Sequence, residues 1–349
     1  RGALSEVAGI HWCGSDGIVS NPCRDPIENL DDLPFPMEAL GCFDPKVYLD
    51  SGTGRAMSPG GMMTSRGCPA RCTFCANYVT GRIYRWRSVP NVLAEMRRIR
   101  AEFGVSHFPF WDDAFTARRS RLLEFCEALS QDSDLRGVTW TCITPANMVR
   151  AADLPTMRAA GCVAINFGIE SGDYNVLRSI KKGQRPEQVQ AAVEAAKAAG
   201  MTTIVNFMFG FPGEGPEELR NTFEFMQNLA PYTDIFNNRG VLVPFPGTPV
   251  YESHREEFGF TDWWMRPEMV PDEVDVFSLS PIDAQEYLEK DSTLELDFFG
   301  YESNTKVWIE RCVRFKALHN RRAMLAPSQA EALELTVKSL RRDAAASVG

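Results

Sequence analysis

The feature that most constrains the fold is a regular alternation of apolar runs and amphipathic stretches that begins at Gly60. The apolar runs predict six strands, over residues 62–65, 106–111, 138–143, 162–167, 202–209 and 235–243. The amphipathic stretches predict helices over residues 89–103, 118–130, 154–160, 186–199 and 216–229. Because strands that alternate with helices form a parallel sheet with covering helices, the sequence predicts an α/β fold.

Three cysteines follow the first predicted strand within eight residues, in the spacing Cys-x-x-x-Cys-x-x-Cys. Cys68, Cys72 and Cys75 can therefore converge on three corners of one polynuclear iron centre. A cubane normally takes four thiolates, so the sequence predicts a [4Fe–4S] cluster with one iron open to a small ligand. A structural zinc site would require a second Cys or His pair at a characteristic spacing, and the sequence contains none.

Composition and net charge indicate in which cellular compartment the protein works and which partners it can bind. The other seven cysteines are dispersed, and an oxygen-labile cluster needs a reducing compartment, so we expect a cytoplasmic protein. No run of about eighteen apolar residues is present, which argues against a membrane span. The formal net charge of −9 argues against nucleic acid as a bulk substrate, because such a substrate requires a basic surface.

The cysteine motif, with the aromatic Phe74 directly before its last cysteine, resembles the signature of the radical S-adenosylmethionine (SAM) superfamily. The strand–helix repeats are similar to that family's open, partial (β/α)6 TIM-like barrel. The resemblance implies that the open iron chelates the amino and carboxylate groups of SAM. An electron from the cluster would then cleave the sulfonium to a 5′-deoxyadenosyl radical. Phe74 is expected to pack near the adenine, and the substrate to lie at the C-terminal ends of the strands.

The same resemblance implies cofactor-binding residues at three further strand ends. Asp112 and Asp113 follow the second strand, where one carboxylate is expected to face the cofactor and the other to cap the next helix. Glu170 lies in a segment similar to the family's ribose-contact motif, although an acid there could also simply stabilise a helix start. Asn206 and Gly210 belong to a strand and loop that resemble the part of the family fold beneath the adenine.

Residues 1–59 are predicted to form an N-terminal connector, with a hairpin that turns near residues 15–17 and a proline-rich linker. Its order resembles the connector of cobalamin-binding radical enzymes, which joins a cobalamin domain to the radical domain. Since the chain starts at Arg1, we expect an upstream domain to be missing or truncated. The cobalamin-ligand pattern Asp-x-His-x-x-Gly is absent from this chain, so cobalamin would bind through that domain or without a histidine from this chain.

Residues 60–250 would then form the barrel, and residues 251–349 a mainly helical C-terminal extension with helices over 307–318 and 329–340. The cobalamin-branch resemblance implies C-methylation or oxidative cyclisation of a small-molecule, lipid or tetrapyrrole substrate. The electron donor would be a reductase, a flavodoxin or a ferredoxin.

Two alternatives remain open at this point. One is an RNA methylthiotransferase-type radical SAM enzyme; such enzymes carry a basic C-terminal module, whereas this tail is acidic between Glu268 and Asp297. The other is a non-catalytic metal-binding scaffold, which would bind zinc or an iron–sulfur cluster without cleaving SAM.

Overall fold

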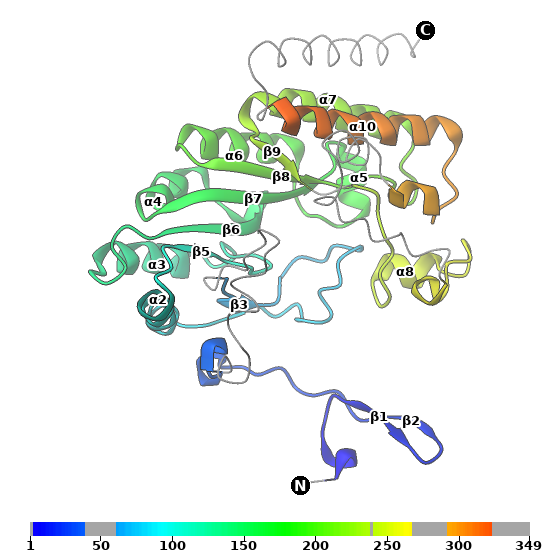
Figure 1. Cartoon of the computed structure of the whole chain (residues 1–349). Coiled ribbons are helices and arrows are strands. Elements are labelled where there is room, and N and C mark those ends of the chain that lie inside the picture. The colour runs from blue at the N-terminus through cyan, green and yellow to red at the C-terminus, as the bar shows by residue number, and fades with distance from the viewer. Residues whose placement is uncertain (1–2, 39–60, 238–239, 267–291, 323–349) are drawn as a thin grey trace.

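The centre of the fold is a five-stranded sheet in the order β5-β6-β7-β8-β9, in which all neighbouring strands run parallel (Figure 1). The structure is a computed structural model that describes residues 3–38, 61–237, 240–266 and 292–322. The strands of the sheet are β5 (His107–Pro109), β6 (Thr139–Pro145), β7 (Cys162–Glu170), β8 (Thr202–Phe207) and β9 (Ile235–Asn237). Strand order follows chain order, and this confirms the predicted α/β fold with a partial, TIM-like barrel.

The first predicted strand contributes less to the sheet than expected. Met62 forms one isolated parallel bridge with Phe110, just beyond β5. The chain then pairs elsewhere, because β3 (Ser65–Arg66) lies antiparallel to β4 (Arg85–Trp86) in a separate two-stranded sheet. This segment therefore joins the sheet through a single bridge, and the cysteine loop follows directly after β3.

The five predicted helices are present within one residue at each end. They are α2 (Val89–Phe103), α3 (Arg119–Gln131), α4 (Leu154–Ala159), α6 (Pro186–Ala198) and α7 (Pro216–Leu229). Local chemistry explains these boundaries in α2: the Ser88 hydroxyl accepts from the Asn91 amide at its start, and Gly104 ends it in a left-handed conformation at φ +67°.

Two short helices were not predicted, and both lie beside the cysteine loop. They are α5 (Tyr174–Ser179) and α8 (Pro249–His254). The third helix outside the predicted repeats, α10 (Ser303–Arg322), contains the expected helix over 307–318 and packs against α7 and β9 (Figure 1). The helix expected over 329–340 lies outside the described residues.

Two hydrophobic clusters form the core. The larger one lies between the sheet and the helices, with Phe110, Phe115, Phe125 and Trp140 packed ring against ring. The smaller one joins α5 and α8 to residues 260–263 and 298–299, and Phe74 packs against it. The second cluster therefore provides an apolar support behind the cysteine loop.

The N-terminal connector contains the predicted hairpin, formed by β1 (His11–Gly14) and β2 (Gly17–Ser20) around a turn at Ser15 and Asp16. Farther along, η2 (Leu30–Asp32) reaches the barrel, where the Asp31 carboxylate accepts from the Ser88 amide at 2.8 Å. The proposed boundary at residues 59 and 60 lies outside the described residues, so the division into three domains stays a prediction. None of the described helices combines the length and apolar character that a membrane span requires.

Candidate functional site

The cysteine loop leaves β3 through a glycine that no other residue could replace without strain. Gly67 has φ +85°, and a Cβ there would lie 2.4 Å from the carbonyl oxygen of Ile83 and 2.8 Å from that of Gly81. The next residue is Cys68, whose amide donates to the same Gly81 carbonyl at 3.2 Å. Close backbone approach thus sets the direction in which the loop begins.

The middle of the loop is tied to the two helices that were not predicted. The Thr73 amide donates to the Ile180 carbonyl at the end of α5, at 3.0 Å. The Thr73 carbonyl accepts from the Val250 amide at the start of α8, at 2.9 Å. Cys68 and Cys72 are buried and Cys75 is half-buried, so the three thiols lie on the protein side of a fixed loop.

A buried ion pair lies beside these thiols. The Lys182 ammonium donates to a Glu170 carboxylate oxygen at 2.6 Å, and each side chain is only 7% exposed. The same ammonium lies 5.7 Å from the centroid of the Phe74 ring. Lys182 was not among the predicted site residues, because its position after α5 could not be recognised without that helix.

The three thiols and the ion pair shift one another's pKa values. Burial raises the pKa of the Cys72 thiol to about 11, and the Lys182 ammonium partly opposes this shift. Burial also raises the pKa values of Cys68 and Cys75, again with Lys182 acting in the opposite direction. Burial alone would lower the pKa of Lys182, but Glu170 and Cys72 outweigh it, so its pKa is raised and the side chain stays charged.

Glu170 reaches this position through an unusual backbone. It has φ +75°, and the pairing of β7 with β8 shifts register between Gly168 and Glu170. A non-glycine residue in the left-handed region costs roughly 1 kcal/mol or more and persists where the surroundings require it. Gly168 leaves space for the ion pair, since a Cβ there would lie 3.0 Å from both Glu170 Oε1 and Lys182 Nζ.

The two predicted acids after β5 have different environments. Asp112 is buried, and its carboxylate accepts from the Thr64 amide at 3.1 Å, from the Thr64 hydroxyl at 2.9 Å and from the Ser65 hydroxyl. Asp113 is exposed, accepts from the Thr80 hydroxyl at 3.0 Å and raises the pKa of Cys68 and Cys75 by its charge. Neither acid caps α3, whose N-cap residue is Arg118. Of the two, Asp113 is the one whose charge reaches the thiols.

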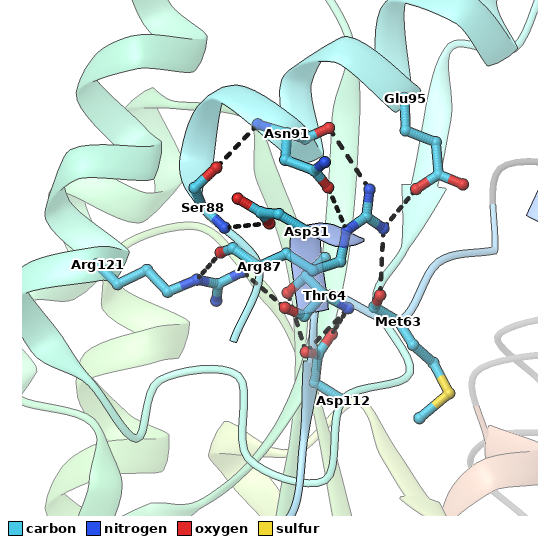
Figure 2. A network of polar contacts seen from close by, with 9 residues as sticks. All are labelled: Asp31, Met63, Thr64, Arg87, Ser88, Asn91, Glu95, Asp112 and Arg121. Atoms are coloured by element: carbon cyan, nitrogen blue, oxygen red, sulfur yellow. Dashed lines mark hydrogen bonds and ion pairs between the residues drawn. The ribbon is translucent and has the colours of Figure 1, made fainter. Parts of the chain in front are cut away.

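Asp112 belongs to a larger network that holds the segment before the cysteine loop (Figure 2). Arg121 donates to the carbonyl oxygens of Arg87 and Thr64, at 3.1 and 3.2 Å. Arg87 is paired in turn with the buried Glu95 of α2. We call Thr64, Arg87, Glu95, Asp112 and Arg121 the support network.

The residues predicted beneath the adenine lie on β8 and the loop after it. The Asn206 side chain donates to Asn166 Oδ1 at 2.6 Å, while its own Oδ1 is buried without a partner in the described part of the chain. Gly210 has φ +74°, and its amide donates to Glu214 Oε2 at 2.6 Å. The Phe211 ring lies 5.6 Å from the Phe74 ring, which brings this loop to the cysteine loop.

These residues fit an iron–sulfur cluster with a polar ligand beside it. Three thiols face a buried ammonium, and two buried acceptors nearby, Asn206 Oδ1 and Gln184 Oε1, have no partner among the described residues. Within the same described residues, no three His, Cys, Asp or Glu side chains gather at a position for a single metal ion. A cubane binds each thiolate through a different iron, so its cysteines do not need to meet at one point.

A partial parallel barrel with a three-cysteine loop after its first strand is typical of a class of iron–sulfur proteins. Comparison with known proteins identifies the family that this barrel matches. The family model of the Radical SAM superfamily matches residues 62–226. The matching family is the one that the cysteine motif indicated.

Similar proteins include a methyltransferase and a cyclase. An uncharacterised methyltransferase of Pyrococcus horikoshii, PH0819, is 30% identical over 251 residues, which are 71% of this chain and 52% of that protein. The anaerobic magnesium-protoporphyrin IX monomethyl ester cyclase of Rubrivivax gelatinosus is 28% identical over 77% of this chain and 48% of its own length. The chain thus spans about half the length of the curated relatives it matches.

The fold also matches a solved cobalamin-dependent radical SAM enzyme. OxsB with aqua-cobalamin bound superimposes with a TM-score of 0.66 over 98% of this chain and 52% of that chain, at 18% identity. Together these similarities confirm the resemblance to the cobalamin-binding branch of the superfamily.

Proposed function

We propose that this chain is the radical-generating part of a radical SAM enzyme that methylates carbon or closes a ring on a small-molecule, lipid or tetrapyrrole substrate. The observation that carries the proposal is the buried Lys182–Glu170 pair beside the three-cysteine loop. The proposal is supported by relatives whose names describe a methyltransferase and a cyclase. When bound, the cluster would supply the electron that cleaves SAM to a 5′-deoxyadenosyl radical.

Different residues of the chain would bind the cluster and the parts of SAM. Cys68, Cys72 and Cys75 would hold the cluster as thiolates, and the Lys182 ammonium would offset part of their negative charge. Glu170 would accept hydrogen bonds from the ribose hydroxyls of SAM, because its carboxylate faces the site from the end of β7.

The adenine would lie near the paired rings of Phe74 and Phe211. Asn206 Oδ1 is buried and would accept a hydrogen bond from the ligand, since its own amide group is already used by Asn166. Gly210 would contribute its backbone only, because a side chain there would collide with the Tyr301 hydroxyl at 2.3 Å. Asp113, whose charge reaches the cysteines, would lie on the side of the SAM amino group.

We propose that cobalamin is bound by a part of the full protein that precedes the connector. The support is indirect: the similar OxsB structure contains aqua-cobalamin, and this chain covers about half of that protein. Each of the four histidines, His11, His107, His254 and His319, already contacts another side chain or a carbonyl oxygen within the described residues.

The test is anaerobic. The protein is reconstituted with iron and sulfide, reduced with dithionite and given SAM, and 5′-deoxyadenosine is measured by chromatography. The proposal expects 5′-deoxyadenosine that is lost when any one of Cys68, Cys72 and Cys75 is replaced. Methylation would also release S-adenosylhomocysteine when substrate is added, whereas ring closure would not. Binding of zinc alone, with no cleavage of SAM, would support the scaffold alternative and overturn the proposal.

A further inference from the structure

A basic pocket opens beside the cysteine loop. Its volume is about 730 Å³, and its walls come from the cysteine loop, from Asn147 and Met148 after β6, from α5 and from the start of α6. Four of its lining residues are exposed cations: Arg71, Arg178, Lys181 and Arg185. The fifth cation in its wall is the buried Lys182. No acidic side chain lines this pocket among the described residues.

The exposed cations of this pocket lack acidic partners. None of the four forms an ion pair with a described residue, although Arg185 stacks over the Tyr174 ring at 5.0 Å. Some other exposed cations, such as Arg97 and Lys197, pair with acids, whereas others, such as Arg136 and Arg158, form no ion pair with a described residue. A concentration of positive charge is notable in a chain whose formal net charge is −9. Its field would attract a negatively charged partner to this one place.

The position of the pocket indicates what kind of partner would bind there. Pro69, Ala70 and Arg71 line the pocket, and they also belong to the loop between the first two cluster cysteines. The pocket therefore adjoins the cluster site. The pocket's other wall, α5, is joined to that loop through the hydrogen bond from Thr73 to Ile180. A protein docked on the exposed cations would lie next to the cluster loop, while the buried Lys182 and Gln184 at the inner wall of the pocket are shared with the proposed SAM site.

We propose that this pocket and its four exposed cations are the docking surface for an acidic one-electron carrier protein of the flavodoxin or ferredoxin class. The inference rests on the proposed function, which needs one electron from outside the chain. In the docked complex the carrier is oxidised by one electron and the bound cluster is reduced by one, and no bond forms or breaks. RNA is the competing polyanion, but four cations around one pocket form a much smaller surface than protein–nucleic acid interfaces usually bury.

The first experiment measures binding and does not depend on catalysis. The affinity of the full chain for a flavodoxin is measured by titration at low and at moderate salt. The test variant is Arg178→Glu with Lys181→Glu. The control is Arg136→Glu with Arg158→Glu, which makes the same change in net charge at the opposite edge of the sheet, before β6 and β7.

We expect the wild-type affinity to fall with salt and the test variant to bind roughly tenfold more weakly, because charge complementarity at an interface mainly sets association. The control variant is expected to stay within about twofold of wild type. Equal losses in both variants would show that only net charge matters and would overturn the proposal. Displacement of flavodoxin by tRNA at equal concentration would likewise overturn it in favour of RNA.

A second readout separates this inference from the proposed function. Dithionite reduces the cluster without docking, so SAM cleavage driven by dithionite should be the same in wild type and test variant. Cleavage driven by reduced flavodoxin should fall in the test variant alone. If dithionite yields no 5′-deoxyadenosine with wild type, the proposed function fails, while the binding result still tests the surface. If the test variant loses dithionite-driven cleavage, the pocket belongs to the SAM site and the docking proposal is wrong.

Discussion

The support network adjoins the cysteine site, since Thr64 lies four residues before Cys68, yet the buried polar groups of the two regions differ in how completely they are hydrogen-bonded. In the support network, Asp112 accepts from two donors of Thr64 and from Ser65, and Arg121 donates to two carbonyl oxygens. At the cysteine site, three thiols lie beside a buried ion pair, and the Asn206 and Gln184 oxygens have no partner within the described residues.

The difference distinguishes a scaffold from a binding site. Buried polar groups are normally satisfied by protein or water, so the satisfied network needs no ligand and can hold the loop in place. By the same rule, the unpaired buried acceptors at the cysteine site lack hydrogen bonds that a bound ligand would supply. We therefore expect mutations in the network to reduce stability and mutations at the site to reduce ligand binding.

The largest effect is expected from Cys72→Ala. This change should abolish cluster assembly, since it removes one of only three thiolates, while the iron-free barrel keeps its fold. Iron and sulfide content, the visible absorption of the cluster and circular dichroism measure both parts of the prediction. Cys126→Ala is the matched control, because Cys126 is also buried but lies in α3 away from the loop. Full cluster occupancy in Cys72→Ala would rule out this ligand.

Replacing Lys182 should affect both stability and binding. Lys182→Met leaves the Glu170 carboxylate buried without its partner, which should lower the free energy of unfolding of the iron-free protein by about 3 kcal/mol. Adding Glu170→Gln should recover more than half of that loss but should not restore SAM binding. Urea titration and equilibrium dialysis with SAM measure the two effects. The exposed neighbour Lys181→Met serves as control, and equal destabilisation there would contradict a special role for the buried pair.

The two adjacent acids after β5 offer a comparison at one place in the chain. Asp112→Asn puts an amide among three donors and should cost about 2 kcal/mol of unfolding free energy. Asp113→Asn removes one exposed acceptor and should change stability by less than about 0.5 kcal/mol. Thermal and urea unfolding of both variants measure the difference. If the two variants are equally stable, the support network does not hold the segment.

The smallest effect concerns pH and the loop after β8. Burial raises the pKa of Glu214 from 4.5 to about 8, even though the amides of Phe211 and Gly210 favour its ionised form. The folded state therefore binds more protons than the unfolded state between these pH values, so the free energy of unfolding falls as pH rises from about 4.5 to 8.

Glu214→Gln cannot ionise and should flatten this part of the stability profile. Relative to wild type, the variant is expected to gain on the order of 2 kcal/mol between pH 5 and pH 8. Urea titrations at several pH values measure the effect, with the exposed Glu217→Gln as control. A wild-type slope retained in Glu214→Gln would show that another group controls the pH dependence.

Much of the fold could be predicted from periodicity alone. The five predicted helices begin and end within one residue of where their apolar spacing and caps indicated, because those signals are local. The first strand was harder: Met62 joins the sheet through one bridge, while Ser65–Arg66 pairs with residues 85–86. That partner follows a loop whose path depends on contacts far along the chain, so no local pattern reveals it.

The site residues also fall into two groups, those that sequence motifs revealed and those that only the structure revealed. The three cysteines, Phe74 and Glu170 were recognised from their motifs, and their roles as ligands stay predictions. Lys182 was missed, because a lysine in a polar stretch has no periodic signal. Asp112 and Asp113 were equivalent in the sequence, and only their surroundings separate them.

The sequence by itself determined the chemistry that is available: three thiols in a spacing suited to a cluster, on a chain that alternates strands with helices. The tertiary structure decided which charged groups meet them. It placed Lys182 against Glu170, committed Asp112 to the support network, and gathered unpaired cations beside the cysteine loop. The physical reason is range: hydrogen bonds within a helix or turn join near neighbours, whereas burial and Coulomb interactions join residues that only the complete fold brings together.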